Sequence, residues 1–277
     1  MIPATLSPPI RVLLGVICLA ACSSNEAGPP STAADDAGNA TPPEGAGPVA
    51  AGCEVTEAPV AVSLSTEDGL TLEADFYPSG VAKGPAAVLL HMIPPSNDKS
   101  NFPAVFIQAL RDRGLSVLNV NRRGAGASDG EPRDAYEGPS GRLDAVAAHR
   151  FVTESGCLAP VGSVVFVAAS NGTTTALDFS VEAAPDARPS ALVFLSPGGY
   201  TENQHTVADN TEVLATIPVM LGYPDSERAW PNAVGEYKGQ AWELHEYDDG
   251  RHGAGLFESN PDVIDDIVGF LDRTLSP

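Results

Sequence analysis

A single serine in the stretch "SVVFVAASNGTTTAL", residues 163–177, has the setting that a nucleophile needs. Ser170 follows an apolar run rich in β-branched residues, with the small residues Ala168 and Gly172 two positions away on either side. A strand that turns tightly into a helix exposes such a hydroxyl, and bulky neighbours would collide inside the turn. A serine at a helix start is also a common N-cap, so this motif alone leaves both roles open.

A serine hydroxyl attacks a substrate when a neighbouring base takes its proton. Of the five histidines, only His252 lies in a loop after a late predicted strand, in "DDGRHGAGLF". The preceding predicted strand ends at Asp225, whose carboxylate could hold the imidazole. The order Ser170, Asp225, His252 therefore fits a nucleophile, acid and base at one edge of a sheet. Three other carboxylates leave the identity of the acid open: Glu227, Asp248 and Asp249.

The elements that would position these residues alternate along the chain from residue 59 onward. Runs 59–66 and 70–78 flank a Glu-Asp-Gly turn and predict an antiparallel hairpin. Further strands are predicted at 85–92, 115–121, 161–169, 190–199, 216–224 and 241–249, and helices at 101–114, 140–154, 172–183, 226–238 and 260–274. This alternation predicts an α/β fold with a mostly parallel, eight-stranded sheet and helices on both faces. Ligands bind outside the carboxyl ends of such strands, where Ser170 would lie.

From about residue 59 to its end, the chain resembles the α/β-hydrolase superfamily, and within it the cap-less, dienelactone-hydrolase-like members. "LLHMIPPSNDKSNF" resembles the loop after the third strand that supplies part of the oxyanion hole. "NRRGAGASDG" resembles the D-x-R-G-x-G-x-S turn, with Asn121 in place of the usual Asp. "LSPGGY" and "GRHGAGLF" resemble further stretches of these members. No long insertion separates 190–199 from 216–224, so we expect no large lid.

The resemblance implies a two-step acyl transfer, in which His252 takes the proton of Ser170 and Asp225 orients the imidazole. It also implies an oxyanion hole built from the backbone N–H of Asn171 and that of Met92 or Ile93. The next two residues are prolines, which have no N–H to donate.

The "NRRGAGASDG" segment has two interpretations. It predicts a turn that requires glycine, and it also offers Arg122 and Arg123 as contacts for an acidic substrate.

The sequence is compatible with three functions. The leading hypothesis is a carboxylesterase-like serine hydrolase that cleaves a small-molecule ester. A peptidase or amidase would use the same triad. A non-catalytic lipoprotein could instead use the hydrolase fold as a binding surface.

The composition excludes some classes of partner. The formal net charge of −21, from 36 acidic and 15 basic residues, argues against nucleic acid, whose phosphates need Lys and Arg. A solvated acidic surface or adaptation to high salt explains the charge. No Cys/His cluster has metal-ligand spacing, so we expect no metal and no cofactor. The sequence leaves the oligomeric state open.

The first residues resemble an export signal. Arg11 precedes the apolar segment "VLLGVICLA", which is too short to span a membrane and suits a signal peptide. The segment ends in "LAAC", which resembles the bacterial lipobox and implies a signal peptide over 1–21 and lipidation of Cys22. In the lipoproteins that this motif resembles, a Ser directly after the lipidated Cys, here Ser23 in place of Asp, implies passage to the outer membrane of the cell envelope. A plain secreted protein would carry a similar export signal.

Residues 22–52 are small, polar and rich in Pro and Gly, which predicts a disordered tether before a hydrolase domain over 53–277. Outside the signal peptide and Cys22, two cysteines remain, Cys53 and Cys157. An oxidising compartment favours a disulfide between them, although both could also be free buried thiols.

We predict that Cys22→Ser releases the protein from the membrane fraction, because the mutant has no thiol to carry the diacylglyceryl group. Cell fractionation, with mass spectrometry of the N-terminal peptide, measures this. Equal membrane retention of the mutant, with no acyl mass on the native peptide, would refute the lipid anchor.

Overall fold

The computed structural model describes residues 54–159, 161–200, 203–229 and 241–275. The predicted signal peptide over 1–21, the tether over 22–52 with Cys22, and Cys53 lie outside these ranges. The lipid anchor and the Cys53–Cys157 disulfide therefore stay predictions, and so does most of the helix at 226–238. Among the described residues, no helix is both long enough and apolar enough to cross a bilayer.

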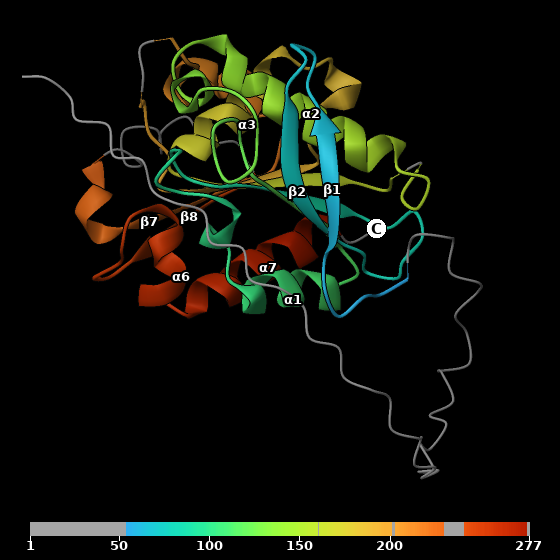
Figure 1. The fold of residues 1–277 in the computed structure, drawn as a ribbon. Coiled ribbons are helices and arrows are strands. Elements are labelled where there is room, and N and C mark those ends of the chain that lie inside the picture. The colour runs from blue at the N-terminus through green and yellow to red at the C-terminus, as the bar shows by residue number, and fades with distance from the viewer. Residues whose placement is uncertain (1–53, 160, 201–202, 230–240, 276–277) are drawn as a thin grey trace, which may run out of the picture. The chain divides into compact units, whose positions relative to one another are not determined.

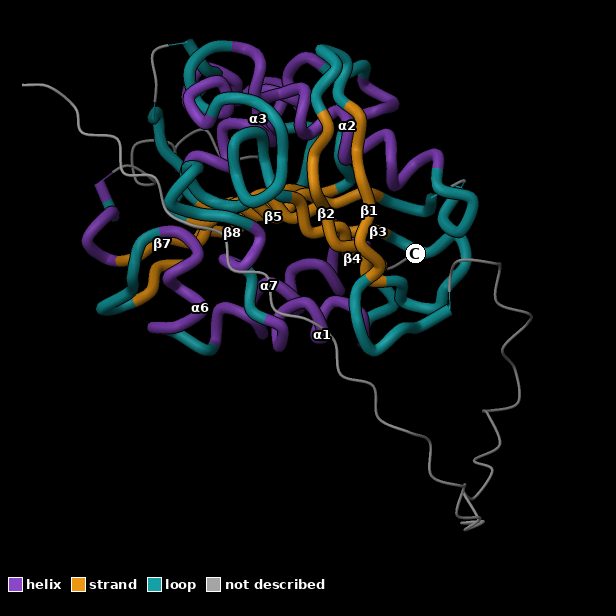
Figure 2. The backbone as a smooth tube through the Cα atoms, viewed as in Figure 1, coloured by secondary structure: helices purple, strands orange, loops and turns teal. Residues whose placement is uncertain are grey.

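One sheet organises the described part of the chain (Figures 1 and 2). Its eight strands run in the order β1-β2-β4-β3-β5-β6-β7-β8. They are β1 Val60–Ser65, β2 Thr71–Tyr77, β3 Ala86–Leu90, β4 Ser116–Val120, β5 Val164–Ala169, β6 Ala191–Leu195, β7 Val219–Pro224 and β8 Trp242–Tyr247. β2 pairs antiparallel with β1 and with β4, and all the other pairs are parallel. The predicted mostly parallel sheet and its hairpin are confirmed.

The burial of the strands explains their sequences. Every residue of β3 to β7 is buried, because helices cover both faces of the sheet there. Such strands are continuous apolar runs, whereas β2 alternates between buried and half-buried positions after its exposed first residue. Two hydrophobic clusters, one on each face of the sheet, form the core.

Helices flank both faces of this sheet. They are α1 Ala104–Asp112, α2 Arg142–Glu154, α3 Asn171–Glu182, α4 Thr211–Leu214, α6 Leu256–Ser259 and α7 Asp262–Leu275. α2 and α3 lie on one face and α1 and α7 on the other (Figure 1). Four of the predicted helices are confirmed to within a few residues. The short helices α4 and α6 were not predicted, because four residues show no helical period.

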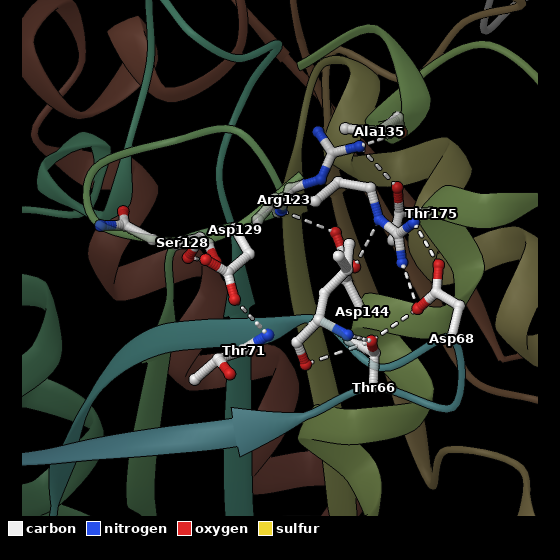
Figure 3. A network of polar contacts seen from close by, with 12 residues as sticks. Thr66, Asp68, Thr71, Arg123, Ser128, Asp129, Ala135, Asp144 and Thr175 are labelled. Atoms are coloured by element: carbon white, nitrogen blue, oxygen red, sulfur yellow. Dashed lines mark hydrogen bonds and ion pairs between the residues drawn. The ribbon is translucent and has the colours of Figure 1, made fainter. Parts of the chain in front are cut away.

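Two buried arginines follow β4 in the "NRRGAGASDG" segment. Arg123 donates to Asp144 through its backbone N–H at 2.9 Å and through Nε at 2.8 Å, and its Nη1 donates to Asp68 at 2.8 Å (Figure 3). Arg122 is fully buried and Arg123 is 1% exposed, so the interpretation as contacts for an acidic substrate is wrong. The interpretation as a glycine-dependent turn agrees with the positive φ of Gly124 and Gly126, 72° and 56°.

Asn121, which stands where the resembled motif has Asp, uses both ends of its amide. Its Nδ2 donates to Glu73 at 2.7 Å, and its Oδ1 accepts the backbone N–H of Lys99 at 2.7 Å. An ionised Asp could only accept, so it would repel Glu73 here.

The start of α3 packs directly on the end of β3. A Cβ added to Gly172 would lie 2.4 Å from the carbonyl oxygen of Leu90 and 2.5 Å from that of His91. Backbone atoms at the end of a buried strand cannot move aside as a flexible side chain could. Gly172 is therefore required by close approach rather than by its φ.

We predict that Gly172→Ala destabilises the fold by at least about 2 kcal/mol, because the methyl group overpacks a backbone contact. Chemical denaturation measures the change. Gly156→Ala is the matched control, since a Cβ at the exposed Gly156 meets nothing within 4 Å. Equal stability of the two variants would contradict the packing argument.

Candidate active site

Ser170 lies in the tight turn between β5 and α3. Its φ of 50° and ψ of −127° are rarely adopted by residues other than glycine, a conformation that costs on the order of 1–3 kcal/mol. Its side chain makes no capping hydrogen bond to α3. The hydroxyl therefore does not serve as the N-cap of this helix.

The Ser170 hydroxyl meets His252, which follows β8. The distance from Ser170 Oγ to His252 Nε2 is 2.7 Å. On the other side of the ring, His252 Nδ1 lies 2.6 Å from Glu227 Oε1. A carboxylate only accepts, so Nδ1 carries the hydrogen and Nε2 is free to accept from the serine. The three side chains form one continuous hydrogen-bonded chain.

The carboxylate at His252 is Glu227 rather than Asp225, so the assignment of Asp225 is corrected. Both residues belong to the 3-10 helix Asp225–Glu227 after β7. At three residues per turn, positions i and i+2 point in directions about 120° apart, so only one of them can face the imidazole. Asp248 and Asp249, the carboxylates nearest to His252 in sequence, are exposed in the turn after β8.

Glu227 is held as a carboxylate by its donors. Burial raises its pKa, but hydrogen bonds from His252 and Ser196 outweigh burial, so the pKa of Glu227 lies below its usual value. The Ser196 hydroxyl accepts the backbone N–H of Gly253 at 2.8 Å, which leaves its own hydrogen for Glu227. Ser196 thus links the loop of His252 to Glu227 through two hydrogen bonds.

Sequence reasoning missed Ser196. It is fully buried and has a φ of 51°, directly after β6. Its position mirrors that of Ser170, which follows the neighbouring strand β5 at the same edge of the sheet. A lone serine after a buried apolar run was the available signal.

The structure distinguishes between the three predicted oxyanion donors by the acceptors that their N–H groups already have. The N–H of Asn171 belongs to the first residue of α3 and has no acceptor within the helix. The N–H of Met92 donates to Asn101 Oδ1 at 3.1 Å, so Met92 is not the second donor in this structure. Ile93 remains as the second candidate.

Two partly exposed residues carry apolar surface: Tyr200, which faces His252, and Ile93, one of the candidate oxyanion donors. The edge of the Tyr200 ring faces His252, with ring centroids 6.3 Å apart, and the Tyr200 hydroxyl donates to the Ser196 carbonyl. Ile93 and Tyr200 are each 37% exposed. Both residues therefore expose apolar side-chain surface. Within the described ranges, no group of three or more His, Cys, Asp or Glu side chains could hold a metal ion.

No family model and no curated protein matches this sequence. Solved structures do match. An esterase from Pyrococcus furiosus aligns with a TM-score of 0.65 at 17% identity, over 79% of this chain and 91% of its own. A lidless serine hydrolase from Xanthomonas campestris aligns at 0.55 and 19%, over 79% and 94%.

A dienelactone hydrolase from Anabaena variabilis also aligns, with a TM-score of 0.56 and 16% identity, over 78% of this chain and 95% of its own. At these identities the likeness concerns the fold. The sheet order, the parallel strands and these neighbours agree, and the chain has the α/β-hydrolase fold.

Proposed function

We propose that this protein is a serine hydrolase that cleaves a small carboxylic ester. The observation that carries the proposal is the chain from Ser170 Oγ to His252 Nε2 at 2.7 Å and from His252 Nδ1 to Glu227 at 2.6 Å. Each member comes from a different strand end, after β5, β7 and β8. A chance cluster of surface side chains would not combine this order with a strained turn at the serine.

In this mechanism His252 takes the Ser170 proton through Nε2 as Oγ attacks the ester carbonyl. Glu227 keeps Nδ1 protonated and stabilises the imidazolium that forms. The oxyanion is held by the N–H groups of Asn171 and Ile93. His252 then donates its proton to the leaving alcohol, and water hydrolyses the acyl-enzyme by the same steps.

An ester of modest size suits the surroundings of Ser170. The segment between β6 and β7 spans residues 196–218, and its described part holds only α4 and a short 3-10 helix. Neighbours of the same fold are an esterase and a hydrolase without a lid, which supports an open site.

We further propose that the activity operates at the bacterial envelope through a lipid on Cys22, on the basis of "LAAC".

The first test is covalent labelling. We expect a fluorophosphonate probe to modify Ser170 and to block hydrolysis of a p-nitrophenyl ester, because the probe needs an activated serine. Ser170→Ala should lose both the label and the turnover, reducing kcat by at least about 10³-fold. A folded wild type that takes no label and cleaves no activated ester would favour a binding role for the fold.

The second test separates the two candidate acids. Glu227→Gln should lower kcat by about 10³ to 10⁴, since an amide can impose the wrong imidazole tautomer. Asp225→Asn, two residues away on the same turn, is the matched control and should keep near-native kcat. Steady-state kinetics on the same ester, with circular dichroism for folding, measure both. The reverse ranking would restore Asp225 as the acid.

A further inference from the structure

Arg122 is a buried cation whose hydrogen-bond partners are all neutral. Its guanidinium donates to five oxygens: the carbonyls of His91 at 3.2 Å, Met92 at 3.4 Å and Ala135 at 2.6 Å, Asn171 Oδ1 at 2.9 Å and Thr175 Oγ1 at 2.7 Å. The nearby carboxylate of Asp144 forms its ion pair with the neighbouring Arg123 instead. Burial lowers the pKa of Arg122 to about 10, so the group stays charged at neutral pH.

One of these contacts orients the peptide that joins Met92 to Ile93. The Met92 carbonyl accepts from His91 Nδ1 at 2.7 Å and lies 3.4 Å from Arg122 Nη1. In a trans peptide the carbonyl and the N–H point in opposite directions. Because the carbonyl faces the buried arginine, the Ile93 N–H faces away from it.

His91 reinforces this orientation. Its Nε2 accepts the backbone N–H of Arg122 at 2.9 Å, which requires the hydrogen on Nδ1, where it donates to Met92. Burial and the neighbouring Arg122 charge lower the pKa of His91 to about 3, so the ring stays neutral. The Met92 carbonyl is therefore held by the Arg122 guanidinium directly and by His91, whose tautomer the backbone N–H of residue 122 fixes.

A further contact reaches the other oxyanion donor. Arg122 Nη2 binds Asn171 Oδ1, and Asn171 Nδ2 donates to Thr174 Oγ1 at 3.2 Å. These bonds hold the Asn171 side chain, which is 1% exposed, inside the protein. The Asn171 side chain therefore does not cover the Asn171 backbone N–H, which begins α3 beside Ser170.

We propose that Arg122 is the positioning residue of the oxyanion hole. It fixes the peptide that carries the Ile93 N–H and the residue that carries the Asn171 N–H, and it places a positive charge behind both donors. This inference rests on the proposed function. A fixed, buried charge behind the donors favours the transition state, where the oxyanion forms, more than the neutral ester.

The test uses two variants of Arg122 and one control. Arg122→Met removes the charge and the branched guanidinium. Arg122→Lys keeps a positive charge, but its single ammonium group cannot bond to the Met92 carbonyl and to Asn171 together. Thr175→Val removes an acceptor of the same guanidinium but touches neither oxyanion donor, so it reports purely structural loss. Active sites are counted with the fluorophosphonate, so that kcat refers to folded enzyme.

We expect Arg122→Met to lower kcat by about 10²-fold with KM nearly unchanged, and to weaken a trifluoromethyl ketone inhibitor by a similar factor. The infrared band of a ¹³C-labelled acyl-enzyme carbonyl should move to higher wavenumber, because the carbonyl is less polarised. Arg122→Lys should show the same pattern to a smaller degree and decides the matter if the Met variant does not fold. Thr175→Val should lose stability but keep kcat and the band.

Two outcomes overturn the inference, and they are distinguishable. If the wild type turns over the ester and the folded Arg122 variants keep kcat and the carbonyl band, Arg122 is only structural. If the wild type neither turns over nor takes the label, the proposed function fails and this inference fails with it.

Discussion

The close contact between the start of α3 and the end of β3 is the constraint on which the site depends. The Gly172 backbone lies against the carbonyls of Leu90 and His91, with no room for a Cβ. This contact brings the turn at Ser170 next to the loop that begins at His91. The contact therefore sets how closely Ser170 and Asn171 approach the segment of Met92 and Ile93, and it helps to hold the strained φ of Ser170.

The parallel sheet supplies the remaining geometry. Since β5, β6, β7 and β8 are neighbours with the same direction, the residues after them emerge along one edge. Ser170, Ser196, Glu227 and His252 follow these four strands in turn. Hydrogen bonds across this edge, from Gly253 to Ser196 and from His252 to Glu227, tie the separate loops together. In the proposed mechanism, loops held in this way need less reorganisation when charge develops in the transition state.

Two adjacent buried arginines are stabilised in different ways. Arg123 forms ion pairs with Asp144 and Asp68 and anchors the turn after β4 to the β1–β2 hairpin (Figure 3). Arg122 is solvated instead by carbonyl, amide and hydroxyl oxygens, several of which belong to the loops beside Ser170. Burying a charge without a direct counter-ion is costly, and such groups concentrate at functional sites.

The sequence by itself determined the fold class, the order of the strands and helices, and the positions of Ser170 and His252. Apolar runs report burial, and a polar residue after such a run reports the functional edge of a parallel sheet. The tertiary structure decided three further points. Glu227 rather than Asp225 faces His252, the Met92 N–H already has an acceptor, and Arg122 is buried. Each depends on the direction of a side chain or peptide within a turn. Contacts with segments distant in sequence set that direction, as between Arg122 and Asn171, which are 49 residues apart. Local sequence carries no record of such contacts.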